Sequence, residues 1–181
     1  MISGNIAHAA RAIQKGGIVA YATEYCFGLG CNPMNRSAVL KLLRLKRRPV
    51  QKGLILIAAD VEQLAPYADD IPAAVAATWP GPHTWLLEPR ENVPGWITGD
   101  HPRIAVRVTA HIQAAALCRA ADMAIVSTSA NRGGGKPIRS DREVARQFMD
   151  EVDVILSGQV GDATAPTPIR DGVSGVLVRP G

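Results

Sequence analysis

The sequence predicts an α/β fold in which a twisted mixed β-sheet is flanked by helices, and three observations support this class. Segments with apolar residues at helical spacing alternate with short apolar runs that are typical of buried strands. With 181 residues the chain has the length of one domain, so we expect a single unit over residues 1–181. Some expected strands follow one another closely, whereas others are separated by a helix, which favours a mixed sheet over a parallel one.

In the first part of the chain, local signals delimit two helices and two strands. Residues 6–13 carry apolar side chains at helical spacing, and two glycines directly afterwards end that helix. Residues 17–21 form a short apolar run, which predicts a buried strand. Asn35 is placed to cap a second helix, which has to end before Pro49 because the residue before a proline disfavours helical geometry. Residues 53–58 show no polar alternation, so we expect a strand covered on both faces.

The rest of the chain continues this alternation, and clusters of glycine and proline separate its segments. Ser140 or Asp141 is placed to cap a helix. We expect helices at residues 71–78, 112–121 and 140–149. We expect strands at residues 83–88, 104–108, 123–126, 152–156 and 173–178.

The composition narrows the class of protein. Hydrophobic residues make up 47% of the chain and charged residues 20%, which is typical of a folded globular domain. The apolar runs are too short to span a bilayer, and the N-terminus lacks the features of a signal peptide, so we expect a cytoplasmic protein without membrane contact. The three cysteines form no CxxC pair and the four histidines show no metal-ligand spacing, which predicts reduced thiols and no metal site.

A basic stretch is the first candidate binding surface. Residues 36–52 contain seven lysines and arginines and no acidic residue. Lys46 and Arg48 lie at a predicted helix C-terminus, where cations interact favourably with the helix dipole, so a purely structural role is one interpretation. The other interpretation is a site for the phosphate groups of a nucleotide or an RNA. We favour ligand binding, because cations crowded on one turn repel one another unless an anion is present.

A polar cluster about eighty residues further on is the second candidate. Residues 127–131 read Ser-Thr-Ser-Ala-Asn and directly follow the strand expected at 123–126. They fit either an N-capping cluster or a polar ligand site at the end of a buried strand. The sequence shows no GxSxG elbow around these serines, which argues against serine hydrolase chemistry.

Two glycine-rich segments fail the tests for standard nucleotide motifs. In the loop expected over residues 22–30, Gly28 and Gly30 lack the third glycine of a dinucleotide-binding turn. Thr23 and Glu24 in the same loop follow a strand, at a position where α/β proteins often bind ligands. Residues 133–136 read Gly-Gly-Gly-Lys but lack both the first glycine and the hydroxyl residue of a P-loop, so we expect a flexible hinge there.

Arg107 stands in the middle of the otherwise apolar strand expected at 104–108. A buried guanidinium group requires an anionic partner. The partner is either an acidic side chain of the core or the carboxylate of a ligand, and the sequence leaves both open.

Six short motifs occur in an order that identifies a resemblance. They are Thr23-Glu24 with Gly28-Leu29-Gly30-Cys31, Leu45-Lys46-Arg47-Arg48-Pro49 with Lys52-Gly53-Leu54-Ile55, Trp79-Pro80-Gly81-Pro82-x-Thr84, Ala105-Val106-Arg107-Val108, Ser127-Thr128-Ser129-Ala130-Asn131 and Ile169-Arg170-Asp171. Together they resemble the YrdC/TsaC family, threonylcarbamoyl-AMP synthases that act in the t6A modification of tRNA. The resemblance covers nearly the whole chain and implies a single YrdC-like domain of the short bacterial form.

The resemblance implies an ATP-dependent nucleotidyltransferase reaction. L-threonine and bicarbonate combine as an N-carboxylate, which attacks the α-phosphorus of ATP to give L-threonylcarbamoyl-adenylate and pyrophosphate. A partner transferase complex then uses the product to modify adenosine 37 of tRNAs that read ANN codons. Mg²⁺ is expected to arrive with ATP, because the sequence shows no carboxylate cluster to hold it. Direct binding of tRNA or another RNA to the basic face stays open.

The resemblance also implies residue roles. The catalytic polar tetrad is Lys46, Arg48, Ser129 and Asn131. The ATP-binding residues are Lys46, Arg48, Lys52, Asn131, Arg139 and Arg179. The threonine-binding residues are Thr23, Arg107, Ser129 and Thr167, with Arg107 suited to the threonine carboxylate.

Four positions depart from the family pattern. Ala22 stands where relatives usually have proline, and Gly133 stands where a serine is common. Thr167 replaces a usual serine and keeps the hydroxyl, whereas Ile57 lies where many longer relatives have a histidine near the threonine site. None of these changes removes a residue of the tetrad.

Two other functions are possible interpretations of parts of the sequence. An RNA-binding or ribosome-maturation factor would use the basic stretch at 36–52 but would have no use for Arg107 or Asn131. An enzyme of carbamoyl transfer, as in the related domain of hydrogenase maturation proteins, would carry acylphosphatase-like and zinc-finger segments, which this sequence lacks.

Overall fold

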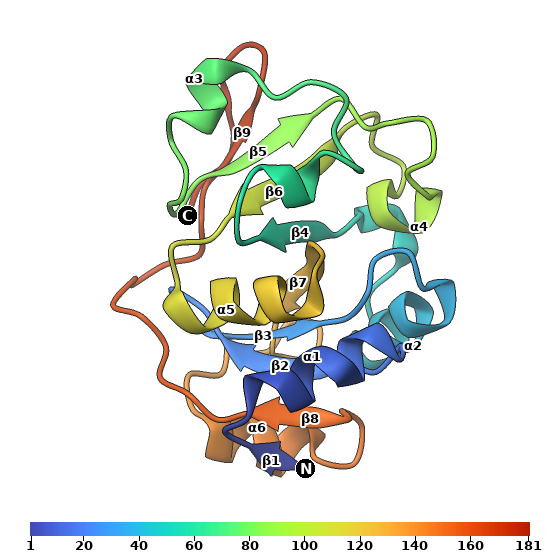
Figure 1. The fold of residues 1–181 in the computed structure, drawn as a ribbon, viewed down its shortest axis with the longest axis vertical. Coiled ribbons are helices and arrows are strands. Elements are labelled where there is room, and N and C mark those ends of the chain that lie inside the picture. Colours follow the sequence, from blue (N-terminus) through green and yellow to red (C-terminus); the bar gives the residue numbers. More distant parts are fainter.

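Ten strands form one mixed sheet in the computed structural model, which describes residues 1–181 (Figure 1). The strands are β1 (Ile2–Ser3), β2 (Val19–Ala22), β3 (Phe27–Gly30), β4 (Ile55–Ala58), β5 (Thr84–Leu87), β6 (Ile104–Val108), β7 (Ile125–Ser129), β8 (Val154–Leu156), β9 (Ile169–Asp171) and β10 (Leu177–Arg179). Their order in the sheet is β1-β8-β2-β3-β7-β4-β6-β5-β9-β10. Parallel pairs such as β4 with β6 occur beside antiparallel pairs such as β2 with β3, which confirms the predicted mixed sheet.

Helices cover both faces of this sheet. They are α1 (Ile6–Gln14), α2 (Arg36–Lys46), α3 (Ala73–Ala76), α4 (Gly95–Thr98), α5 (Ile112–Ala121) and α6 (Asp141–Phe148). Helices α1 and α5, which lie in front of the central strands in Figure 1, share one apolar core with Tyr21 and Ile57. Helices α2 and α6 contribute to a larger core on the other face. None of the helices combines the length and the apolar character that a bilayer crossing requires.

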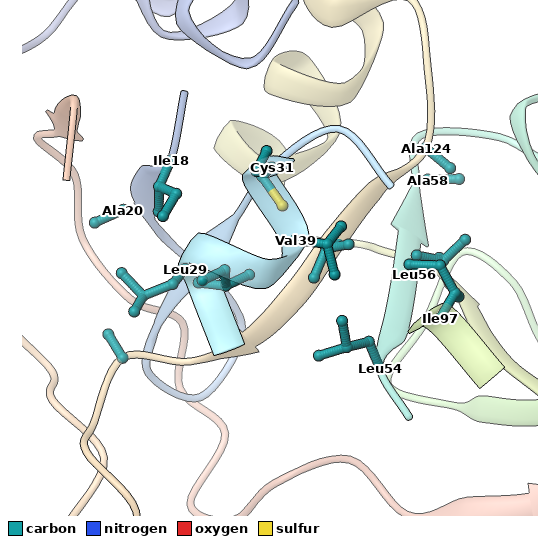
Figure 2. Packing of buried hydrophobic residues seen from close by; sticks show 14 of the residues in the cluster. Ile18, Ala20, Leu29, Cys31, Val39, Leu54, Leu56, Ala58, Ile97 and Ala124 are labelled. Carbon is teal, nitrogen blue, oxygen red and sulfur yellow. The ribbon is translucent and has the colours of Figure 1, made fainter. Parts of the chain in front are cut away.

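Helix α2 illustrates how the larger core is packed. Figure 2 shows Val39 of α2 between Leu29 of β3 on one side and Leu56 of β4 on the other. All three side chains are inaccessible to solvent, as is Leu42 one turn further along the helix. The polar side chains of α2, such as Lys41, point away from this core and are exposed. The helix is therefore held to the sheet by one apolar face, as its sequence pattern predicts.

The ends of α2 follow the predicted local chemistry. The Asn35 side chain accepts a hydrogen bond from the Ala38 N–H at 3.0 Å, which confirms the predicted N-cap. The helix ends at Lys46, before Pro49, as expected. Arg47 adopts a left-handed conformation with φ 50°, and the following N–H of Arg48 bonds back to the last helical turn. This turn sends Arg48 away from the helix axis.

Other predicted helices are confirmed with small changes. Helix α5 has the predicted bounds, and Ser140 caps α6 through a hydrogen bond to its first turn. The helix expected at 71–78 is wrong in length, because only Ala73–Ala76 is helical. Pro72 directly before it has a non-helical ψ of 139°, and Ile71 is disfavoured in helical geometry because it precedes a proline.

Strand β3 was not predicted, because its two glycines indicated a loop at 22–30. The segment instead pairs antiparallel with β2 and β7, in the interior of the sheet. A Cβ atom on Gly30 would lie 2.5 Å from the Val126 carbonyl oxygen and 2.9 Å from the Tyr21 ring. Glycine at this position therefore permits close packing between strands and forms no phosphate-binding turn.

Strand β7 extends further than predicted. The expected strand ended at Val126, and the following serines were interpreted as a possible N-cap. The strand continues through Ser129, and Ser127 pairs with Ile55 of β4. No helix follows at this point, so the capping interpretation is wrong. Hydrogen bonds to β3 and β4 on both sides override the weak strand preference of the serines.

The strand expected at 173–178 is also wrong. A tight turn separates β9 from β10, because the Asp171 carboxylate accepts hydrogen bonds from the Val173 N–H at 3.0 Å and from the Ser174 N–H at 2.8 Å. Gly175 in this turn has a φ of 73°, which favours glycine. The valines at 173 and 176 are exposed in the turn and at its edge.

Helix α2 offers a matched test of the core assignment. We expect Leu42→Ala to lower the free energy of unfolding by about 2–5 kcal/mol, because it leaves a cavity beneath the sheet. Lys41→Ala on the same helix removes a half-exposed ion pair to Asp153 and should cost less than about 1 kcal/mol. Urea unfolding of both variants measures the difference, and equal losses would contradict the burial of the Leu42 face.

Candidate active site

A cavity of about 580 Å³ collects side chains from both halves of the chain. Its walls come from the loop after β2, the end of β7, strand β6, the turn after α2 and the C-terminal residues. Six of the site residues expected from sequence line it: Thr23, Arg48, Arg107, Ser129, Thr167 and Arg179.

The register of the sheet explains why these side chains share one face. Directly paired residues point to the same side of a sheet, so Arg107 points with Ile57, and Ser127 with Ile55. Ile57 belongs to the core beneath α1 and α5, so these lining side chains lie on that face of the sheet. Gly28 forms part of its floor, and a Cβ atom there would lie 3.5 Å from Ser127 Oγ. Because Gly28 has no side chain, this part of the cavity stays open.

Lys46 joins the two polar clusters. Its ammonium group donates to the Ser129 carbonyl, to the Asn131 carbonyl at 2.7 Å and to Asn131 Oδ1 at 3.5 Å. Lys46 is 5% exposed and lies behind the cavity wall. Burial, and then the charge of Arg48, lower the pKa of Lys46 to about 8. The clusters at 46–48 and 127–131 therefore meet in space, which sequence spacing did not establish.

Arg48 and Arg179 form a cationic wall without acidic partners. Arg48 donates to the Gly53 carbonyl through Nε at 3.2 Å and through Nη2 at 2.8 Å. Arg179 donates to the Thr167 carbonyl at 3.0 Å, and no carboxylate lies within 4.0 Å of either guanidinium. Burial lowers the pKa of both arginines, and the charge of Arg179 lowers that of Arg48 further. An anion bound between the two guanidinium groups would reduce the repulsion between their charges.

Arg107 has an acidic partner and also lines the cavity. Its Nη2 lies 3.2 Å from Glu24 Oε2, and the two side chains are 8% and 14% exposed. Glu24 Oε1 accepts hydrogen bonds from Thr109 Oγ1 at 2.6 Å and from the Ala110 N–H at 3.2 Å. The sequence left open whether Arg107 pairs with an acidic side chain or with the carboxylate of a ligand. The acidic side chain is present, and because Arg107 also lines the cavity, it is accessible to a ligand as well.

The C-terminal segment covers one side of the cavity and is tied to its floor. Thr167 Oγ1 lies 3.0 Å from Thr84 Oγ1 at the start of β5. Arg139 donates to the carbonyls of Tyr25, of Ala163 at 3.1 Å and of Gly161 at 3.2 Å, and its guanidinium stacks 5.5 Å from the Tyr25 ring centre. Arg139 therefore links the loop after β2 to the segment before Thr167.

The remaining expected residues lie outside the cavity lining. Asn131 is positioned behind Ser129, whose Oγ lies 2.5 Å from Asn131 Oδ1. The Asn131 amide nitrogen donates to the Gly135 carbonyl at 2.8 Å. The side chain of Lys52 is exposed, and its carbonyl accepts a hydrogen bond from Arg48 at 3.1 Å.

The departures from the family pattern have structural consequences. Ile57 is fully buried in the core and does not line the cavity, whereas Ile55 does. The Ala22 N–H donates to Gln113 Oε1 at 3.4 Å, a bond that proline could not form. The Gly133 N–H caps α2 by donating to the Lys46 carbonyl at 3.1 Å, so the expected hinge begins with a fixed turn.

Two polar lining residues, Ser127 and Glu24, were noted in the sequence but given no role in the expected site. Ser127 belonged to the candidate cluster at 127–131 but was given no role of its own; extending the two-residue alternation from Ser129 would have placed it on the same face. Glu24 was noted with Thr23 at a strand end where ligands often bind, but it was not assigned to the site. The need of Arg107 for an anionic partner was the signal that could have identified it.

The arrangement is suited to holding anions and contains no activated nucleophile. Burial raises the pKa of the Cys26 thiol to about 11, so this cavity-lining cysteine is protonated at neutral pH. The serines of β7 have no histidine partner. The structure contains no group of three or more His, Cys, Asp or Glu side chains placed to hold a metal ion. The arginines and hydroxyl groups of the lining are suited to aligning and neutralising anionic ligands.

Known proteins share this sequence and fold. The sequence model of the family described as Sua5_yciO_yrdC, telomere recombination, matches residues 11–181. The threonylcarbamoyl-AMP synthase of Halorhodospira halophila is 49% identical over 178 residues, which cover 96% of this chain and 93% of that protein. The threonylcarbamoyl-AMP synthase of Methylococcus capsulatus is 52% identical over 175 residues, which cover 94% of each protein.

A solved structure shares the fold over nearly the whole chain. The crystal structure of P. abyssi Sua5 complexed with L-threonine superposes with a TM-score of 0.90 at 35% identity and covers 97% of this chain. This chain spans 54% of the length of that protein. Because the family model covers residues 11–181 and these relatives align over most of the chain, the chain belongs to the Sua5/YciO/YrdC family.

Proposed function

We propose that this chain is a nucleotidyltransferase that makes L-threonylcarbamoyl-adenylate from L-threonine, bicarbonate and ATP and releases pyrophosphate. The observation that carries the proposal is one cavity with unpaired arginines on one wall and hydroxyls beside a buried arginine on another. The relatives named threonylcarbamoyl-AMP synthase support it, as does the L-threonine complex of P. abyssi Sua5. A single domain over residues 1–181 would carry both substrate subsites.

In this proposal the cationic wall binds ATP. Arg48 and Arg179 take phosphate oxygens, because their charges have no acidic partner in the protein. Lys46 adds positive charge from behind Ser129 and, together with Asn131, holds the end of β7 in position. Arg139 shapes the nucleotide subsite through its contacts with the Tyr25 loop. Lys52 contributes only a longer-range charge, because its side chain is exposed outside the cavity.

The opposite part of the cavity binds threonine in this proposal. Arg107 takes the threonine carboxylate, since a guanidinium group pairs well with a carboxylate. Thr23, Ser129 and Thr167 offer hydroxyl groups for the polar atoms of the substrate. Thr167 replaces the serine that is usual in the family, and its hydroxyl is already oriented by the contact with Thr84.

The proposed reaction needs no covalent intermediate. A carbamate oxygen bonds to the α-phosphorus of ATP, the bond from that phosphorus to the bridging oxygen breaks, and pyrophosphate leaves with the electron pair. Both reactants are anionic, so fixed cations are needed to bring them together, and such groups lower the barrier by about 3–4 kcal/mol each in comparable sites. Mg²⁺ enters as part of the ATP substrate.

The product would supply the t6A modification of tRNA. Threonylcarbamoyl-adenylate is a mixed anhydride that hydrolyses readily, so a partner transferase complex has to receive it soon after synthesis. This role places the protein in the cytoplasm with tRNA. The basic stretch at 36–52 is a candidate surface for direct contact with RNA.

The reaction is tested by pyrophosphate release from ATP in the presence of bicarbonate and single amino acids. We expect release that requires both L-threonine and bicarbonate. Arg48→Ala should lower kcat/KM by about 10²–10³-fold, because it removes a cation that neutralises the phosphates. Lys46→Ala should be similarly impaired.

Arg36→Ala is the matched control for this test. Arg36 is an exposed arginine at the start of α2, in the same basic stretch, and we expect its activity to stay within about twofold of the wild type. Pyrophosphate release that is indifferent to threonine would refute the proposed reaction. Equal losses of kcat/KM in Arg36→Ala and Arg48→Ala would contradict the assignment of phosphate binding to the cationic wall.

The lowered pKa of Lys46 predicts a pH dependence of ATP binding. In the free protein this lysine is charged below its pKa of about 8 and neutral above it. A bound polyphosphate favours the charged form and raises the pKa, so binding takes up a proton and weakens as the pH rises from about 7.5 to about 9.5. Calorimetric titration with ATP in buffers of different ionisation enthalpy measures both effects.

Lys46→Arg provides the control, because arginine stays protonated over this whole range. We expect the proton uptake to disappear in this variant and the affinity to vary little with pH. If the variant keeps the same pH dependence as the wild type, another group titrates and the assignment to Lys46 is wrong.

A further inference from the structure

Glu24 is a feature of the cavity that the proposed reaction leaves unexplained. It is the one acidic side chain among the residues that line the cavity. A negative charge is unfavourable in a site that has to hold a polyphosphate and an amino-acid carboxylate, because like charges repel in a poorly solvated space. The negative charge of Glu24 is therefore best explained if a positive group of the ligand compensates it in addition to Arg107.

In this ion pair, one buried polar atom of each partner has no hydrogen bond. Both hydrogen bonds of Glu24 go to Oε1, from Thr109 at 2.6 Å and from the Ala110 N–H at 3.2 Å. Glu24 Oε2 lies 3.2 Å from Arg107 Nη2 but forms no hydrogen bond, and Arg107 Nε has no hydrogen-bond partner either. Both atoms are buried, so leaving them without a hydrogen bond carries a penalty that a ligand could remove.

We propose that Glu24 recognises the cationic amino group of the amino-acid substrate, so that Glu24 and Arg107 together select a zwitterion. This inference rests on the proposed function, since it assigns the atoms of the same substrate. The free acceptor on Glu24 matches an ammonium group, and the free donor on Arg107 matches a carboxylate. The protein pair is neutral as a unit, so a ligand with a carboxylate alone would bring an uncompensated negative charge, whereas a zwitterion would not.

The ionisation of Glu24 suits this role. Burial raises the pKa of Glu24, but the charge of Arg107 and the hydrogen bond from Thr109 outweigh burial and hold the pKa below its ordinary value. Glu24 is therefore an anion at neutral pH and a weak proton acceptor. It fits charge recognition of the amino group better than removal of its proton.

The loop that carries Glu24 is tied to the segment at 161–163. The backbone is fixed, because the Ala163 N–H donates to the Glu24 carbonyl at 3.1 Å and the Gly161 N–H donates to the Thr23 carbonyl at 3.0 Å. Glu24 already lines the cavity, and Oε2, which accepts no hydrogen bond in the protein, is the oxygen left for a ligand.

Binding calorimetry without ATP tests the inference. The ligands are L-threonine and 3-hydroxybutyrate, which is threonine without its amino group. We expect the wild type to prefer L-threonine by more than about tenfold, the usual effect of a hydrogen bond to a charged group. In Glu24→Gln the affinity for L-threonine should fall by about tenfold while that for 3-hydroxybutyrate stays equal or rises, so the preference is lost.

Thr109→Val is the matched control. It removes the hydrogen bond to Glu24 Oε1 but keeps the carboxylate, so the preference for L-threonine should persist. An undiminished preference in Glu24→Gln would overturn the inference. So would an equal loss of both ligands in that variant, because it would mean that Glu24 only supports Arg107.

The wild type provides a measurement that does not depend on the folding of any variant. If it binds 3-hydroxybutyrate as tightly as L-threonine, Glu24 does not select for the amino group and the inference is wrong. In that case threonine-dependent pyrophosphate release would still occur, and the proposed function would stand. A wild type that releases no pyrophosphate with threonine would instead remove the proposed function together with the inference.

Discussion

The contact between the Lys46 ammonium group and the end of β7 is the interaction on which the rest of the site depends. Helix α2 packs on one face of the sheet, and the cavity opens on the other. Lys46 bridges the two by donating to the carbonyls of Ser129 and Asn131, at the point where β7 leaves the sheet. The turn that follows Lys46 then delivers Arg48 to the cavity wall. Without this contact, the turn that carries Arg48 would lose its link to the strand that carries the hydroxyl groups.

A second constraint is how the protein holds its cations. Arg48, Arg139 and Arg179 donate to backbone carbonyls and have no carboxylate partner. Carbonyl oxygens satisfy the hydrogen bonds of a guanidinium group without cancelling its charge, so the net charge stays available for an anionic ligand. Arg107 is the exception, and its acidic partner lies where the ligand is proposed to bring a positive group of its own. The distribution of partners thus divides the cavity into an anion-binding part and a part suited to a zwitterion.

The shape of the cavity comes from the sheet itself. Residues on β2, β3, β6 and β7 point to one face because their register brings them together, although they lie far apart in the chain. Gly28 leaves space on that face between the β2 loop and Ser127, and Gly30 lets β3 approach β7 closely. The C-terminal segment then covers the opening through Thr167 and Arg179. The glycines that imitate a nucleotide-binding turn in the sequence are therefore strand residues that make room.

Local sequence determined the elements whose signals are local. The cap at Asn35, the end of α2 before Pro49 and the bounds of α5 depend on neighbouring residues, so they could be predicted. The order of six short motifs also determined the family and the residue types of the site. Tertiary structure alone decided that 127–129 and 27–30 are strands, because hydrogen bonds from strands on both sides outweigh the preferences of serine and glycine. It also decided that Glu24 is the acid that accompanies Arg107. Lys46 likewise lies 83 and 85 residues in sequence from its partners Ser129 and Asn131, and only the folded sheet brings these groups within hydrogen-bonding distance.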